Sequence, residues 1–367
     1  MRRIKELDGI RGAAILFVLA YHYFSNGAGI NNSIGRQFLK LFSIGWSGVD
    51  LFFVLSGFLI VGILLDAKSS NNYFSSFYIR RALRILPLYY LLLTLFLILP
   101  IFISNDGIFK LTFPFWSYLL FIQNLFMIKF DLGASWLGVT WSLAIEEQFY
   151  LLLPILVWKL DKKRLVYIFI CLIAMAPIIR VLFDGLGSYV FAFARSDSIL
   201  AGGLLAIAYR DQKVKNLLTQ NINLLFALFF IFLIGAGALI FSGHGQIGDA
   251  LLHLWIAVLY SLLLVICVLS PSKLTTILIS NPILIWLGTR SYSIYLFHIP
   301  IMLLAHQFLI GNPYFSNWHE FYINVLASII TFIFAELSFR FFESFFLSYG
   351  KSFQYKFDKT PLPISKE

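Results

Sequence analysis

The sequence has few charged residues and few cysteines. Asp, Glu, Lys and Arg make up only 13% of the 367 residues, about half the share usual in soluble domains. The two cysteines, Cys171 and Cys267, lie in apolar runs without metal-ligand spacing, so we expect two small buried side chains. HExxH, CxxC, Walker A, GxGxxG and GxSxG motifs are all missing, which argues against zinc, nucleotide-loop and serine-hydrolase sites.

Apolar residues are abundant instead, at 60% of the chain, and the mean hydropathy is +0.84. The excess extends over the whole chain, which predicts an all-α polytopic transmembrane bundle without a sizeable soluble domain. At about 20 residues per span there is room for about ten spans. We expect a membrane domain over 1–345 and a short polar cytoplasmic tail over 346–367. The expected spans are 9–26, 45–65, 85–104, 140–158, 165–183, 196–209, 222–242, 250–270, 291–310 and 320–342.

The net charge of +10 is explained by topology rather than by a nucleic-acid partner. In the ten-span arrangement, 22 of the 28 lysine and arginine residues fall on the side of the termini. Cytoplasmic loops of membrane proteins are enriched in these residues, so both termini are predicted to be cytoplasmic. The segment 115–130 is apolar but contains Gln123 and Asn124; it is re-entrant, interfacial or an eleventh crossing. A crossing there would invert every later loop and remove the charge asymmetry.

Ionisable residues at membrane depth are costly and are therefore candidates for function, although pairing that holds the bundle together is the alternative. Arg11 and His22 lie eleven residues apart, so they share a helix face at about 16 Å separation. Gly9 and Gly12 would let a backbone or a ligand approach that face. Arg81 and Arg84 lie one turn apart; they are suited to clamping a phosphate or to anchoring the chain on the cytoplasmic side.

The acidic candidates are Asp50, Glu146 and Glu147. Asp50 is either a partner for a cation such as His22 or a helix cap. Glu146 and Glu147 point about 100° apart on a helix, so at most one of them faces a given site. Arg195 and Asp197 open a span on the outer side, and Tyr295 and His298 share a face. Four further histidines are expected to pack near the outer helix ends: His244, His253, His306 and His319.

Six segments together resemble the acyltransferase family 3 of integral membrane acyltransferases. They are LDGIRGAAILFVLAYH, GVDLFFVLSGFLI, FYIRRALRILPLYY, WSLAIEEQFYLLLP, RSDSILAGGLLA and SYSIYLFHIP, in this order along nearly the whole chain. The family pattern Arg-x10-His falls on Arg11 and His22, and its Arg-x-x-Arg pattern falls on Arg81 and Arg84. The sequence departs from the family at Glu343, which Ser-Phe-Phe follows in place of Arg-Pro-Phe, so the role of this glutamate is open. With no esterase-like SGNH domain after the bundle, we expect a stand-alone form.

The resemblance implies a bundle of about ten helices that transfers an acyl group from cytoplasmic acyl-CoA to an extracytoplasmic glycan hydroxyl. We expect a bacterial inner-membrane O-acyltransferase, with acetyl-CoA as donor and no metal. O-antigen, exopolysaccharide, lipid-linked oligosaccharide and a secreted metabolite remain open as acceptors, and the oligomeric state is open. A glycolipid or polysaccharide transporter or flippase is the main alternative, and a membrane sensor or scaffold is a third.

The same resemblance gives the expected site residues their roles. Arg11, Arg81 and Arg84 would hold the phosphates of the donor. His22 would act as the base, oriented by Asp50, Glu146 or Glu147; an acyl-histidine intermediate is the other route. The acceptor side would be formed by Trp141, Arg195, Asp197, Tyr295 and His298, together with the two glutamates.

Overall fold

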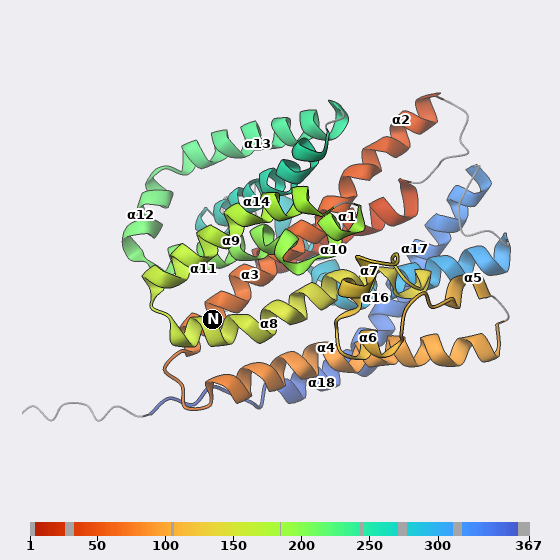
Figure 1. Ribbon diagram of the computed structural model, residues 1–367, viewed down its shortest axis with the longest axis horizontal. Coiled ribbons are helices and arrows are strands. Elements are labelled where there is room, and N and C mark those ends of the chain that lie inside the picture. The colour runs from red at the N-terminus through yellow and green to blue at the C-terminus, as the bar shows by residue number, and fades with distance from the viewer. Residues whose placement is uncertain are drawn as a thin grey trace, which may run out of the picture.

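The computed structural model describes residues 4–25, 33–103, 106–183, 185–242, 245–270, 277–310 and 318–358, and within these ranges all regular structure is helical. The predicted all-α class is therefore confirmed. Figure 1 shows long helices running side by side along the longest axis of the molecule. The long helices are α1 (Lys5–Phe24), α3 (Gly48–Ala67), α4 (Tyr73–Ile98), α8 (Trp141–Lys159), α9 (Lys162–Leu182), α11 (Ser196–Arg210), α13 (Ile222–Ser242), α14 (Gln246–Leu269), α16 (Pro282–Leu309) and α17 (Trp318–Ser338). Shorter helices are α2 (Ser33–Phe42), α12 (Gln212–Gln220) and α18 (Ser344–Gly350).

Seven helical stretches of the described chain are long and apolar enough to cross a membrane, so this is a multi-pass membrane protein. They are Ser43–Ala67, Tyr73–Ile101, Lys162–Leu182, Ile222–Ile240, Gln246–Leu269, Pro282–Leu309 and Phe321–Gly350. The three other expected spans correspond to α1 and α8, which carry charged residues, and to α11. With 15 residues, α11 extends only about 22 Å. The count of ten spans thus stays a prediction.

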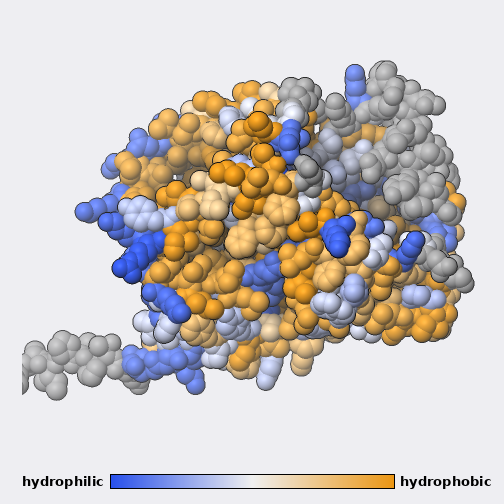
Figure 2. Space-filling view, in the orientation of Figure 1, coloured by the Kyte–Doolittle hydropathy of each residue, from blue (hydrophilic) through white to orange (hydrophobic). Residues whose placement is uncertain are grey.

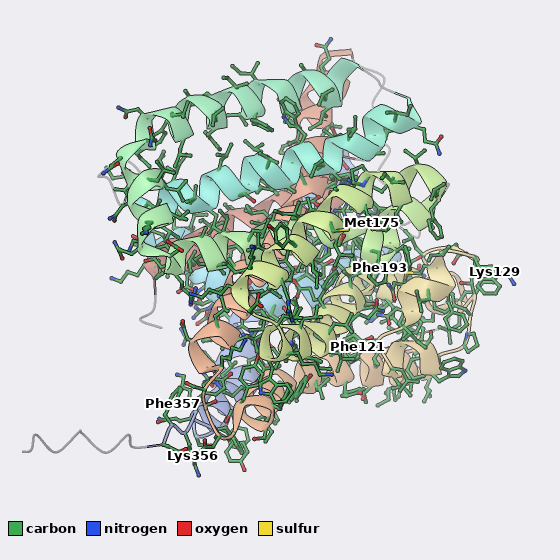
Figure 3. All side chains as sticks on the ribbon, turned by 60° about the vertical axis from the view of Figure 1, so that its left-hand side comes forward. Phe121, Lys129, Met175, Phe193, Lys356 and Phe357 are labelled. Carbon is green, nitrogen blue, oxygen red and sulfur yellow. The ribbon has the colours of Figure 1, made fainter. Side chains whose placement is uncertain are left out.

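On the face shown in Figure 2 most of the surface is apolar, and hydrophilic residues gather at the left-hand end, with smaller patches elsewhere. Met175 on α9, for example, is 44% exposed and projects outward (Figure 3). Such exposed apolar side chains suit contact with lipid chains. The apolar surface agrees with a molecule that sits in a bilayer.

The start of α1 and the C-terminal tail lie toward the same end of the bundle (Figure 1). The tail is docked there on the start of α4: the Lys356 amide N–H donates to Asn72 Oδ1 (2.8 Å), and the Asn71 amide N–H donates to the Lys356 carbonyl (2.9 Å). The two ends of the described chain thus lie at one end of the bundle, an arrangement that fits an even number of crossings. Some of the lysines and arginines counted for membrane sidedness, and one of the histidines expected near helix ends, lie outside the described residues: Arg2, Arg3, Lys273, Lys359, Lys366 and His244. The side chains of Arg36, Lys40 and His319 are likewise outside the described part of the structure.

The segment 115–130 folds into two short helices, α6 (Trp116–Leu119) and α7 (Gln123–Met127), which are far too short to cross a bilayer. Phe121 between them has a positive φ of 55°. The fully buried Gln123 donates from Nε2 to the Thr140 carbonyl (2.9 Å). An eleventh crossing at this point is therefore excluded.

Close helix packing at two glycines positions the functional elements. A Cβ atom at Gly12 would lie 2.0 Å from the Leu284 carbonyl oxygen of α16, and one at Gly57 would lie 1.7 Å from the Ile199 carbonyl oxygen of α11. Only glycine permits such backbone approaches. The face of α1 at Gly12 is thus approached by the backbone of α16, not by a ligand, and α1, α3, α11 and α16 form one tightly packed unit.

Candidate active site

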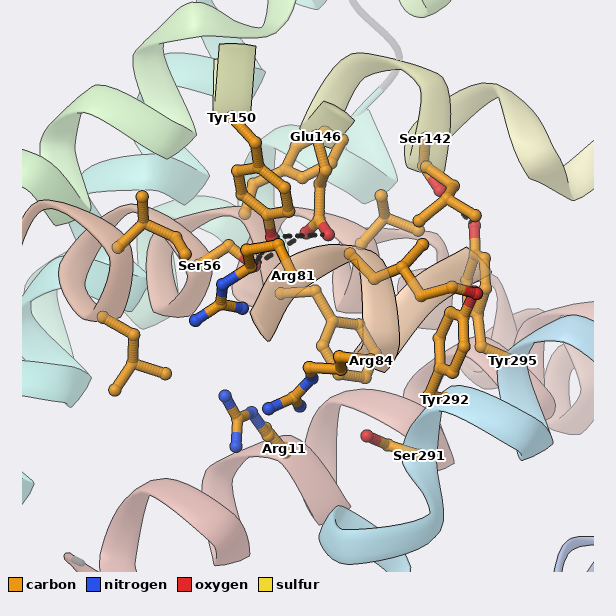
Figure 4. A pocket seen from close by; sticks show the side chains of 17 residues that line it. Arg11, Ser56, Arg81, Arg84, Ser142, Glu146, Tyr150, Ser291, Tyr292 and Tyr295 are labelled. Carbon is orange, nitrogen blue, oxygen red and sulfur yellow. Dashed lines mark hydrogen bonds between the residues drawn. The ribbon is translucent and has the colours of Figure 1, made fainter. Parts of the chain in front are cut away.

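A partly open cavity lies between α1, α3, α4, α8 and α16, with about 780 Å³ of unfilled space that includes open solvent. We call it the arginine cavity because Arg11, Arg81 and Arg84 all extend their guanidinium groups into it (Figure 4). Deeper lining residues include Phe52 and Leu143. Arginines from two segments that are far apart in the sequence thus meet in one cavity. One part of this cavity is charged and the other part is apolar.

Two of these three arginines have no ion pair in the described part of the chain. The Arg81 guanidinium instead lies over the rings of Tyr150 (5.6 Å) and Phe77 (5.9 Å), and Arg11 is 3.4 Å from Asp8 Oδ1. Arg84 forms no ion pair with a described residue.

Other arginines of the bundle are tightly paired, such as Arg290 with Glu336 (2.5 Å) and Arg210 with Asp66 (2.6 Å). Arg11, Arg81 and Arg84 thus share a single ion pair among the described residues, at 3.4 Å, and an arrangement of this kind suits an anion.

The arginine cavity continues into a wider mouth of about 1230 Å³ that shares Arg11, Arg81 and Arg84 with it. This mouth is also lined by Asp8, near the start of α1, and by Gly350 and Lys351, near the C-terminal tail. The arginine cavity therefore opens at the end of the bundle that carries both ends of the described chain.

Glu343 also lines the mouth. It sits on a π-helical turn, Phe339–Glu343, and accepts a hydrogen bond from Ser338 Oγ (3.3 Å). Single π turns inside α-helical runs are frequent at functional sites. The geometry places this glutamate beside the arginines without giving it a reaction role.

The two glutamates of α8 differ in their surroundings. Glu146 lines the arginine cavity, and its carboxylate accepts hydrogen bonds from Ser56 Oγ (2.7 Å) and the Tyr150 hydroxyl (3.0 Å; Figure 4). Glu147 does not line this cavity, and its buried Oε1 has no hydrogen-bond partner. Glu146 was expected beside the acceptor, and the structure places it with the arginines instead.

His22 lies at the opposite end of α1 and lines a separate cavity of about 1210 Å³, which we call the histidine cavity. Further lining residues are Tyr21, Trp46, Trp141 and Tyr189. Trp141, an expected acceptor residue, is therefore beside His22. The two cavities share two lining residues among those described, Val49 and Tyr295.

Tyr295 forms the wall between the cavities and is held there by hydrogen bonds. Its hydroxyl donates to the Val139 carbonyl (2.9 Å) and is 2.5 Å from Ser142 Oγ. Ser142 follows Trp141 at the start of α8, so the wall is anchored to the same helix start that lines both cavities.

His298 is the polar partner of His22. Its Nδ1 lies 2.7 Å from the Tyr295 carbonyl oxygen, which can only accept, so Nδ1 carries the proton. In a neutral ring Nε2 is then an acceptor, and it lies 3.2 Å from His22 Nδ1. That nitrogen of His22 is also 3.0 Å from the Val18 carbonyl oxygen. His22 Nδ1 is therefore the donor, and its Nε2 is left unprotonated.

The expectation that Asp50 orients His22 does not match the structure. Asp50 is fully buried and accepts hydrogen bonds at Oδ1 from Arg195 Nη2 (2.7 Å) and Ser198 Oγ (2.7 Å). His253 lies 3.8 Å from its other oxygen and also contacts the Arg195 guanidinium. A fully desolvated arginine draws a buried carboxylate more strongly than a neutral histidine does.

Arg195 and Asp197, expected to meet the acceptor, are both fully buried. Asp197 pairs with Arg180 (2.7 Å). Both thus lie behind the cavity walls rather than in them.

Sequence reasoning missed Ser56, Tyr150, Tyr189 and His253 as parts of the site. A signal existed for Tyr150, which follows Glu146 by four residues and so shares its helix face. His253 was expected only to pack.

The chain matches the model of the family described as acyltransferase domain (Acyl_transf_3) over residues 4–337. The peptidoglycan O-acetyltransferase OatA of Listeria monocytogenes is 30% identical over 96% of this chain and 58% of its own length. YrhL of Bacillus subtilis, provisionally named a peptidoglycan O-acetyltransferase, is 32% identical over 93% of this chain and 54% of its own. A Staphylococcus aureus protein provisionally named an O-acetyltransferase is 31% identical over 95% of this chain and 58% of its own length.

The chain thus spans a little over half the length of these relatives. No solved structure has significant similarity to it. The family match extends from the start of α1 into α17 and so includes Arg11, His22, the arginines of α4 and His298. On this evidence the chain belongs to the acyltransferase family 3 of membrane acyltransferase domains.

Proposed function

We propose that the protein is an O-acyltransferase of the bacterial cytoplasmic membrane, which moves an acetyl group from cytoplasmic acetyl-CoA to a hydroxyl group of a cell-envelope glycan. The observation that carries the proposal is the pair of cavities at opposite ends of α1. One holds three arginines and the other holds His22, with Val49 and Tyr295 as their common wall. Donor and acceptor can therefore enter from opposite ends and react at this wall.

The arginine cavity suits the donor. Coenzyme A combines phosphate groups with a long thin arm that ends in the thioester. Arg11, Arg81 and Arg84 would bind the phosphates by charge-assisted hydrogen bonds. Apolar residues deeper in the cavity, Phe52 and Leu143 among them, would then surround the arm, which brings the thioester toward Tyr295.

His22 has the form required of a general base. Its unprotonated Nε2 would take the proton of the acceptor hydroxyl while the hydroxyl oxygen bonds to the thioester carbonyl carbon. The carbon–sulfur bond then breaks, and His22 returns the proton to the thiolate. The products are the O-acetyl ester and free coenzyme A, and no other reactant is needed.

The names of the relatives support the choice of acceptor class. OatA is named a peptidoglycan O-acetyltransferase, and an envelope glycan is the corresponding acceptor here. O-antigen, exopolysaccharide and lipid-linked oligosaccharide are alternatives within the same chemistry.

The test is transfer of radiolabel from acetyl-CoA to the producing cell's own envelope glycans by purified protein in proteoliposomes. The His22→Ala variant should lose transfer and keep its affinity for acetyl-CoA, because the donor cavity is separate. A Lys129→Ala variant, changed at an exposed loop residue, is the control. Near-normal transfer by His22→Ala would refute the role of His22. Movement of glycan across the membrane without a new ester would instead indicate a transporter.

A further inference from the structure

The histidine cavity does not end at His22. It adjoins a second cavity of about 1410 Å³, which we call the side cavity, and the two share Trp46 and Tyr189. The side cavity is lined by polar groups, including Ser188, Gln246 and Asp249. We call the histidine cavity and the side cavity together the groove, and each of them one lobe of it.

A row of rings connects the two lobes. The ring centroids of Trp141 and Tyr189 are 4.7 Å apart, those of Tyr189 and His253 are 5.8 Å apart, and those of His253 and Trp46 are 4.9 Å apart. Trp141 lines the histidine cavity, His253 lines the side cavity, and the other two line both. We call these four residues the aromatic wall.

A buried cation holds this wall in place from behind. The Arg195 guanidinium lies 4.9 Å from the centroid of Tyr189 and 5.9 Å from that of Trp141, and it contacts His253 directly. Its charge is balanced by Asp50 at 2.7 Å, and both residues are fully buried. Fixing the rings before a ligand arrives lowers the entropic cost of binding. This use of Arg195 explains why a charge is buried so close to the groove.

Aromatic walls with polar groups at their edges suit saccharides. The C–H groups on one face of a sugar ring carry partial positive charge and stack on the negative face of an aromatic ring. The hydroxyl groups around the rim need hydrogen-bond partners, and the side cavity is lined by side chains of the kind that form such bonds, Ser188, Gln246 and Asp249. A small acceptor with one hydroxyl group would use only the lobe at His22.

We infer that the groove binds a saccharide chain of at least two sugars, with the acylated sugar beside His22 and its neighbour in the side cavity. The placement of the acylated sugar rests on the proposed function. The binding of the chain to the two lobes does not. The proposed acceptor is thereby narrowed from an envelope glycan of any size to a chain of at least two sugars that occupies both lobes.

The test measures affinity as a function of chain length. Envelope glycans of the producing cell are partially hydrolysed and separated into fractions of one, two, four and six sugars, and each is titrated calorimetrically into the full chain in nanodiscs. The Kd should fall about tenfold or more from one sugar to two, and change little beyond four. Equal affinity at all lengths, or no binding at any length, would overturn the inference.

Two variants separate the side cavity from general effects. Ser188→Trp places a large ring in the side cavity and should abolish the gain from the second sugar while leaving single-sugar binding intact. Lys129→Trp adds the same ring at an exposed position that lines neither cavity and should keep the gain. A gain that survives Ser188→Trp would place the second sugar elsewhere.

Acetyl transfer measured on the same fractions distinguishes the two proposals. A Kd that depends on chain length, without transfer from acetyl-CoA, would support saccharide binding in the groove and refute the proposed reaction. Transfer to single sugars as efficient as transfer to longer chains would confirm the reaction and refute the groove.

Discussion

His22 Nδ1 lies 3.2 Å from His298 Nε2, so a fully buried imidazole orients the imidazole that lines the histidine cavity. In Ser-His-Asp sites a carboxylate holds the tautomer of the histidine. Here the Tyr295 carbonyl fixes the proton of His298, and His298 in turn accepts from His22. A neutral ring does this without an uncompensated charge in a low-dielectric region.

His298 is therefore a positioning residue, and its replacement should slow acetyl transfer without weakening the binding of the donor acetyl-CoA. His298→Phe should lower kcat about tenfold, since a hydrogen bond lost at the transition state is worth ~1.4 kcal/mol, and leave the KM for acetyl-CoA unchanged. His298→Gln keeps an acceptor and should recover part of kcat. Steady-state kinetics in proteoliposomes measure this. Equal losses in both variants would reduce His298 to a packing role.

The arginine pair of α4 predicts a specific loss of donor affinity. Hydrogen bonds to charged groups are worth ~1.5–3 kcal/mol, so Arg81→Ala and Arg84→Ala should each raise the Kd for acetyl-CoA about 10–100-fold. Binding of envelope glycan fragments should not change. Titration calorimetry in nanodiscs measures both affinities.

Arg164→Ala provides the matched control, because Arg164 is exposed and its one ion pair among the described residues is with Asp161, three positions before it. Its Kd for acetyl-CoA should equal that of the unchanged protein. If Arg81→Ala and Arg84→Ala also bind the donor normally, the two arginines are topological anchors.

The all-helical class, the membrane location and the faces of individual helices could be predicted from sequence, because they depend on local composition and on the 3.6-residue period. Arg81 and Arg84 were placed on one face correctly for this reason. Partners between distant helices could not be predicted. Asp50 meets Arg195 because Gly57 lets α11 approach α3 closely, and this approach depends on three-dimensional packing.

The buried Asp50–Arg195 ion pair predicts that removal of Asp50 lowers the stability of the folded protein. Asp50→Ala leaves Arg195 buried with its main anion removed, which should destabilise the protein by about 3–5 kcal/mol. Thermal unfolding in detergent, followed by tryptophan fluorescence, should show a clear fall in Tm. The double variant Asp50→Leu, Arg195→Met removes both charges and should regain much of the loss. An unchanged Tm in Asp50→Ala would point back to a role for Asp50 in the reaction.

The position of Tyr295 between the two cavities predicts that its side chain keeps water away from the thioester. Tyr295→Ala would widen the connection between the two cavities where donor and acceptor meet, so more water from the histidine cavity would reach the thioester. The rate of acetyl-CoA hydrolysis in the absence of acceptor should rise severalfold. This rate is measured by detecting the free thiol that hydrolysis releases. Tyr295→Phe keeps the ring and should retain slow hydrolysis. Slow hydrolysis in both variants would mean that another group seals the donor cavity.

The sidedness of the two cavities is the remaining prediction, and it separates transfer across the membrane from an ordinary cytosolic reaction. Excess lysine and arginine on the side of the termini predicts that the mouth of the arginine cavity faces the cytoplasm. Ser69, just after α3, and Lys129, just after α7, are exposed at opposite ends of this arrangement. With Cys171 and Cys267 replaced, cysteines at positions 69 and 129 should react with an impermeant thiol reagent from opposite sides of sealed vesicles. In the same vesicles, acetyl-CoA should be accepted only from the side of position 69. Reaction of both cysteines from one side would refute the topology, and with it the entry of donor and acceptor from opposite faces.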